Sequence, residues 1–106
     1  MTFSHLENLP KKNAIPGGVL STIHTENVTI TYWDFEPGAL IPAHAHSHEQ
    51  VTILLDGEFR MKVGDETEVM KGGSFVTIQP DEEHSGEALS TCKLMDVFYP
   101  VREDFK

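Results

Sequence analysis

The sequence predicts an all-β fold, a single jelly-roll β-barrel, on three observations. Short stretches with apolar residues at every second position follow one another along the chain. Turn residues separate these stretches at roughly 8–12-residue spacing, as in sandwiches and barrels. No stretch shows the apolar periodicity of an amphipathic helix. The chain has 106 residues, which fits one domain and leaves no room for a second, and a jelly roll is the most economical architecture of this size.

The first 17 residues differ from the rest of the chain. They contain Pro10 and Pro16, end on Gly17, and show little periodicity. This composition predicts an arm that lies over the body rather than a helix. The β-barrel domain is therefore expected to span residues 18–106.

The first clear strand is predicted over residues 28–33. Val28, Ile30 and Tyr32 alternate there with Thr29, Thr31 and Trp33, as in a strand covered on both faces. The turn sequence Glu36-Pro37-Gly38 ends it.

A hairpin is predicted around Asp56-Gly57. The apolar run 51–55 precedes this pair, and an alternating segment over 59–63 follows it. Gly64-Asp65 forms the next turn, and further short strands are expected around Val69, over 75–78 and over 92–99.

The strand that begins near Gln50 predicts a partner for its outer face. Gln50, Thr52 and Leu54 share one parity, so the apolar residues Val51, Ile53 and Leu55 point the other way. Such an apolar strip is unusual on a monomer. A homodimer is therefore expected, although the N-terminal arm is an alternative cover.

Charge and hydropathy exclude several classes of partner. Eight Lys and Arg residues against 17 Asp and Glu residues give a net charge of −9, which repels nucleic acid. No apolar run approaches the roughly 20 residues that span a bilayer. The N-terminal residues lack the pattern of a secretory signal, which predicts a cytoplasmic protein. An acidic ligand would need a local positive centre, such as a metal ion or one arginine.

A histidine cluster supplies candidates for that centre. His44, His46 and Gln50 share parity, but a straight strand would place His44 and Gln50 roughly 20 Å apart. We therefore expect a hairpin turn through residues 47–49, with both histidines on one strand and Gln50 opening the next. His84 begins a later strand and can complete the set from across the barrel. The alternative is a solvated polar loop.

The spacing of these residues resembles the first motif of the cupin superfamily. Gly38 is followed after five residues by His44-x-His46, after three more by Gln50 and after six more by Gly57. Gln50 stands where the motif usually has Glu. The second motif matches in part, because Gly73 lies eleven residues before His84, while Pro80 is one place late, Asp81 replaces Gly and Ala88 replaces Asn. The resemblance implies a jelly-roll barrel with a metal ion inside it.

The expected cofactor is one divalent transition metal ion bound by His44, His46, Gln50 and His84. Nitrogen and oxygen ligands suit Ni, Fe, Mn, Co or Zn. Because all four ligands are neutral, the full +2 charge stays available to polarise and anchor a carboxylate. Glu49 is a rival ligand, but its parity points it away from the histidines. His48 is either a residue at the edge of the site or plain surface.

The C-terminal residues 94–105, together with the histidine motif, resemble the short cupins of pectin and alginate degradation. Those proteins convert 4,5-unsaturated uronates into linear keto uronates. The resemblance implies that Asp96, Phe98 and Arg102 line the substrate site. Asp96 and Phe98 share parity and can both face inward.

The residue types suit that chemistry, since ketonisation moves protons and no electrons. Asp96 is the expected acid/base group, and Arg102 offers a planar fork for a sugar carboxylate. The alternatives are an Asp96 satisfied by the backbone or an arginine, an Arg102 paired with Glu103 or another acid, and a Phe98 that only fills the barrel. Two other functions compete: an iron or copper dioxygenase, and a sugar-binding module without activity.

Overall fold

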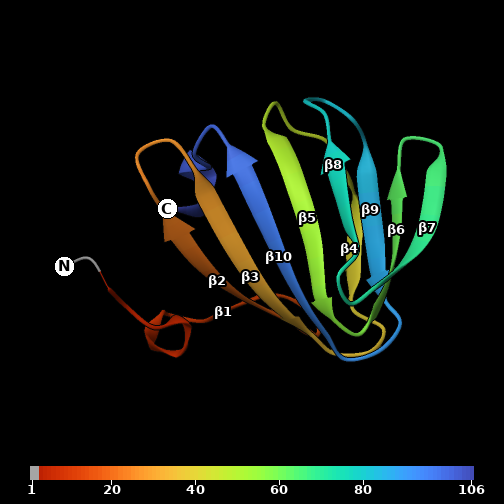
Figure 1. Ribbon diagram of the computed structural model, residues 1–106, viewed down its shortest axis with the longest axis horizontal. Helices are drawn as coiled ribbons and strands as arrows, with labels where there is room; N and C mark the ends of the chain where they lie inside the picture. Colours follow the sequence, from red (N-terminus) through yellow and green to blue (C-terminus); the bar gives the residue numbers. More distant parts are fainter. Residues whose placement is uncertain (1–2) are drawn as a thin grey trace.

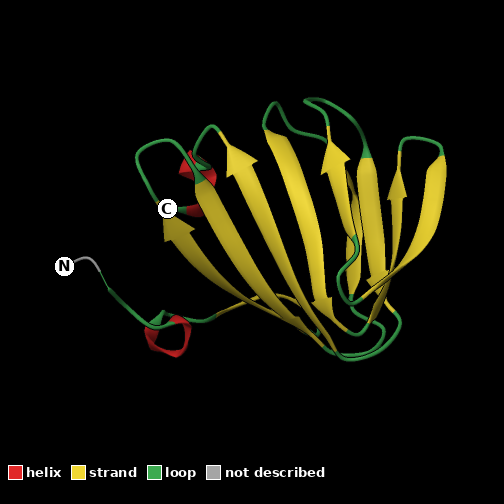
Figure 2. Ribbon diagram, viewed as in Figure 1, coloured by secondary structure: helices red, strands yellow, loops and turns green. Residues whose placement is uncertain are grey.

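The computed structural model describes residues 3–106, which fold into two antiparallel sheets and two three-residue 3-10 helices, η1 (Leu6–Asn8) and η2 (Glu103–Phe105). Figures 1 and 2 show the two layers. The six-stranded sheet contains, in spatial order, β1 (Lys12–Ile15), β2 (Gly18–His24), β3 (Thr29–Phe35), β10 (Cys92–Tyr99), β5 (Glu49–Asp56) and β8 (Phe75–Ile78). The four-stranded sheet contains β4 (Leu40–His44), β9 (His84–Ala88), β6 (Glu58–Val63) and β7 (Glu66–Lys71). The predicted all-β jelly-roll class is confirmed.

The core lies between the sheets and follows the predicted alternation. On β5 the side chains of Gln50, Thr52 and Leu54 are buried, whereas their neighbours Val51 and Ile53 are only partly buried on the outer face. Aromatic rings continue the core toward the four-stranded sheet, because Phe35 of β3 stacks on Trp33 and on Phe59 of β6, with ring centroids 5.0 and 5.6 Å apart. The register predicted for β5 from parity is therefore confirmed.

Two predicted hairpins are wrong. β5 and β6 lie in different sheets, so Asp56-Gly57 carries the chain from one layer to the other (Figure 1). Gly57 has φ 93° and packs closely on the carbonyl of Thr91, a corner that a side chain would obstruct. A turn-forming pair indicates that the chain bends, but not which strand it pairs with next.

The second wrong hairpin is the turn predicted after His44. β4 ends at His44 in the four-stranded sheet and β5 begins in the six-stranded sheet, so His46 lies in the connection rather than on the strand of His44. The turn between β6 and β7 through Gly64-Asp65 is a true hairpin, with Val63 opposite Glu66.

The N-terminal segment adds a strand to the edge of the six-stranded sheet. Lys12–Ile15 form β1, which pairs with β2. The boundary placed at residue 17 stays a prediction. Across residues 3–106, no helix is long and apolar enough to cross a membrane.

Candidate metal centre

The three predicted histidine ligands converge at one end of the four-stranded sheet. His44 ends β4 and His84 begins β9, and these two residues face each other in the antiparallel ladder with ring centroids 4.1 Å apart. His46 follows in the loop, with its ring 5.0 Å from that of His84. One ring nitrogen from each histidine lies within 4.8 Å of the other two.

Backbone carbonyls orient all three rings. The Nδ1 atoms of His44, His46 and His84 lie 2.9, 3.1 and 2.9 Å from the carbonyl oxygens of Pro42, His48 and Glu82, respectively. A carbonyl oxygen only accepts hydrogen bonds, so each Nδ1 carries the proton and each Nε2 keeps its lone pair. This is the tautomer in which imidazoles bind metal ions through Nε2.

The second ring nitrogen of His84, Nε2, is buried without a hydrogen-bond partner in the described part of the chain. The residue as a whole is 2% exposed. Burial lowers the pKa of His84 and of His46, and the nearby Arg102 lowers both further. Both imidazoles are therefore neutral at neutral pH and suited to a cation.

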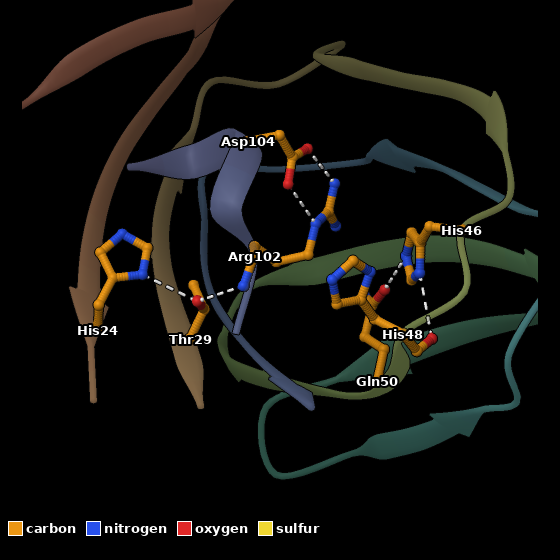
Figure 3. Close-up of polar contacts among 7 residues, drawn as sticks. All are labelled: His24, Thr29, His46, His48, Gln50, Arg102 and Asp104. Atoms are coloured by element: carbon orange, nitrogen blue, oxygen red, sulfur yellow. Dashed lines mark hydrogen bonds and ion pairs between the residues drawn. The ribbon is translucent and has the colours of Figure 1, made fainter. Parts of the chain in front are cut away.

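Gln50 gives independent support for a positive charge at this point. Its amide nitrogen donates to Thr52 Oγ1 at 2.8 Å and to Asp96 Oδ1 at 3.1 Å, which turns Oε1 toward His46. Oε1 lies 2.9 Å from His46 Nε2 (Figure 3). Two acceptor lone pairs at this distance need a proton or a cation between them. Since the pKa of His46 is lowered, the residues fit a metal ion with Gln50 beside the three histidines.

A buried carboxyl group lies directly behind Gln50. Asp96 of β10 accepts hydrogen bonds from Thr52 at 2.7 Å and from Thr31 at 3.1 Å, in addition to Gln50. Burial raises the pKa of Asp96 above its ordinary value, although these three donors lower it in part. The group is thus biased toward its protonated form.

The contacts of Thr31 and Thr52 with Asp96 were not predicted from the sequence. Thr52 shares the inward parity of Gln50, and Thr31 lies opposite Asp96 on β3, so the period-two pattern could have pointed to both. Their hydroxyls replace the backbone or arginine partner that was considered for Asp96.

Arg102 lies beyond the end of β10 and is not free. Its Nε and Nη2 donate to the two carboxylate oxygens of Asp104 at 3.0 and 2.8 Å. The guanidinium carbon lies 4.8 Å from the ring centroid of Phe98 and 4.1 Å from that of Phe105. An ion pair between Arg102 and an acid therefore exists, as the alternative interpretation of the sequence allowed, and the acid is Asp104.

These residues enclose a cavity of about 290 Å³ between the sheets. Its wall includes the predicted residues His44, Gln50, His84, Asp96, Phe98 and Arg102. Phe105 also lines it, which the sequence did not indicate. Glu49 is exposed on the opposite face of β5, away from the histidines, and His48 contributes its carbonyl to the orientation of His46.

Comparison with known proteins decides the family. The cupin domain model matches residues 31–98, more than half of the chain. The chain is a cupin. The matched segment of this cupin begins in β3, ends in β10 and contains all four predicted metal ligands.

Solved structures confirm the fold of this cupin. An RmlC-like cupin from Shewanella frigidimarina is 27% identical, with a TM-score of 0.94 over 100% of this chain and 96% of that one. KdgF from Halomonas sp. is 22% identical, also with a TM-score of 0.94, over 100% of this chain and 99% of that one. An oxalate decarboxylase variant from Bacillus subtilis is 19% identical, with a TM-score of 0.83 over 98% of this chain and 32% of that one. No curated protein sequence matched the chain.

Proposed function

We propose that this cupin uses one divalent metal ion to convert 4,5-unsaturated uronates into linear keto uronates. The observation that carries the proposal is the arrangement of the cavity, whose wall contains the imidazoles of His44 and His84, a buried acid and an arginine, with His46 completing the histidine cluster beside it. The similarity of residues 94–105 and of the histidine motif to the short cupins of pectin and alginate degradation supports this substrate class.

His44, His46, His84 and Gln50 are the residues that would hold the ion. When bound, it supplies a positive charge that anchors the sugar carboxylate and stabilises negative charge on the enol oxygen. Ni, Fe, Mn, Co and Zn all suit these donors. The carbonyls of Pro42, His48 and Glu82 fix the rings beforehand, so little reorganisation accompanies binding.

Asp96 moves the proton in this proposal. An unsaturated uronate is a cyclic enol ether. Cleavage of the bond between C1 and the ring oxygen, with transfer of the C1 hydroxyl proton to the ring oxygen, leaves an aldehyde at C1 and an enol at C5. Protonated Asp96 donates to C4 and the carboxylate recovers a proton from the enol hydroxyl, which becomes the ketone. The reaction is an isomerisation and requires no oxidant. The raised pKa of Asp96 favours the form that donates.

Arg102 and Phe98 position the substrate. The guanidinium lines the cavity and offers a planar set of donors to the sugar carboxylate. The Phe98 ring lies between Arg102 and His46, with its centroid 5.6 Å from that of His46. It forms the wall against which the sugar would lie.

The test follows the conjugated double bond of unsaturated galacturonate by its absorbance, without oxygen and with metal-loaded protein. The proposal predicts an accelerated loss of absorbance that chelation abolishes. A reaction that stops without oxygen would indicate the dioxygenase instead. Binding without acceleration over buffer would indicate a sugar-binding module.

We also propose a homodimer through the outer face of the six-stranded sheet. Val51 and Ile53 of β5 lie there beside Phe75 of β8, and Met95 and Val97 of β10 continue the same face. Apolar side chains contributed by adjacent strands form a continuous surface of the kind that subunits cover.

A further inference from the structure

The guanidinium group of Arg102 is already occupied by a carboxylate of the same chain. Asp104 forms a two-point contact with Nε and Nη2, at 3.0 and 2.8 Å (Figure 3). This is the geometry in which arginine binds the carboxylate of a ligand. The Arg102 side chain is only 11% exposed and borders the cavity, whereas that of Asp104 is 59% exposed.

Arg102 is held in place without Asp104. Its backbone N–H donates to the buried Thr29 Oγ1 at 2.8 Å. Its guanidinium carbon lies 4.8 Å from the centroid of Phe98 and 4.1 Å from that of Phe105, so stacking contacts fix the side chain. The ion pair therefore adds charge neutralisation more than orientation.

Asp104 is placed so that its carboxylate can move away from Arg102. It belongs to η2, a single turn held by backbone hydrogen bonds from Phe105 to Arg102 and from Lys106 to Glu103. A rotation of its exposed side chain breaks the contact without moving β10. Arg102 keeps the pKa of Asp104 below its ordinary value, so the competing group is ionised at neutral pH.

We propose that Asp104 competes with the ligand carboxylate for Arg102 and thereby limits the affinity of the cavity for acidic sugars. The inference rests on the proposed function in that Arg102 receives the sugar carboxylate. Even a ligand that uses the free Nη1 edge meets a guanidinium whose charge Asp104 already neutralises. Removal of the Asp104 charge therefore strengthens carboxylate binding in either pose.

The test is calorimetric binding of galacturonate, a saturated analogue that does not react, to metal-loaded protein. Five proteins are compared: wild type, Asp104→Asn, the matched control Glu103→Gln, Arg102→Met, and the double variant of Arg102→Met with Asp104→Asn. Glu103 is the neighbouring acid, which pairs with Lys106 at 3.3 Å instead of with Arg102. Galacturonic acid methyl ester serves as the ligand without a charged carboxylate.

We expect Asp104→Asn to bind galacturonate about fivefold more tightly than wild type, the upper end of what an exposed ion pair contributes. The ester binds both proteins equally, and Glu103→Gln behaves as wild type. In the Arg102→Met background, Asp104→Asn has no effect. The comparison of Asp104→Asn with Glu103→Gln stands by itself if Arg102→Met does not fold.

Unchanged or weaker galacturonate binding in Asp104→Asn would overturn the inference, because Asp104 would then position Arg102. Failure of every variant to bind galacturonate would overturn it too, since a carboxylate site is required. Ketonisation of the unsaturated uronate by wild type is measured in a separate assay. If wild type shows turnover but Asp104→Asn does not bind galacturonate more tightly, only this inference is contradicted. If Asp104→Asn binds more tightly but wild type shows no turnover, only the proposed function is contradicted.

Discussion

At the scale of single residues, the direction of each hydrogen bond decides the chemistry. Peptide carbonyls accept hydrogen bonds from the Nδ1 atoms of the three histidines, which leaves the Nε2 lone pairs available to a cation. Asp96 accepts hydrogen bonds from Thr31, Thr52 and Gln50. These donors lower the pKa of Asp96, but burial raises it by more. A histidine cluster that could hold a cation and an acid whose pKa is raised thus lie side by side, joined by Gln50.

The role of Asp96 predicts that Asp96→Asn loses turnover but keeps the metal ion. Asparagine is nearly isosteric with the acid, so the polar cluster is filled, but it cannot donate and recover a proton. We expect the rate of ketonisation to fall at least about 100-fold, with unchanged metal content by elemental analysis. Asp34→Asn, on the exposed side of β3, is the control. Near-normal turnover in Asp96→Asn would remove this residue from the mechanism.

At the scale of elements, β5 links fold and site through its period of two. Gln50, Thr52 and Leu54 point inward from one strand, so the same alternation that buries Leu54 in the core delivers Gln50 to the histidines. This part was predictable from the sequence, because parity depends only on residue order. The pairing partners of β5 were not predictable, since no local pattern states that β10 and β8 flank it.

The two faces of β5 predict different costs for neighbouring leucines. Leu54 is completely buried, whereas Leu55 is 44% exposed. Leu54→Ala is expected to lower the free energy of unfolding by about 2–5 kcal/mol, and Leu55→Ala by less than about 1 kcal/mol. Chemical denaturation measures both free-energy changes, at a protein concentration below the dissociation constant of the dimer. Equal losses would contradict the assigned register.

At the scale of the whole molecule, the site exists because the chain changes sheets twice around it. The connections after β4 and after β5 each pass from one layer to the other, so His44 and Gln50 approach from different sheets. The motif spacing predicted that these residues meet, while the assumption of hairpins gave the wrong route. Asp104 and Phe105 escaped prediction because their roles depend on where η2 folds back, which no periodicity encodes.

The proposed dimer predicts that a charge on the outer face of the six-stranded sheet separates the subunits. Phe75 is 69% exposed on that face, directly opposite Ile53 in the ladder. Phe75→Glu is expected to yield monomers in sedimentation velocity, whereas wild type sediments as a dimer. Leu40→Glu, at a 60% exposed position on β4 of the other sheet, is the control and stays dimeric. A monomeric wild type, or a dimeric Phe75→Glu, would contradict this interface.

The metal content of the purified protein tests the central claim most directly. Elemental analysis is predicted to find about one divalent transition metal ion per chain in wild type and in His5→Ala, whose imidazole is exposed and remote from the cluster. His84→Ala is expected to lose most of that metal, because its buried Nε2 has no other partner in the described structure. Undiminished metal in a folded His84→Ala, or none in wild type after incubation with these ions, would contradict the account.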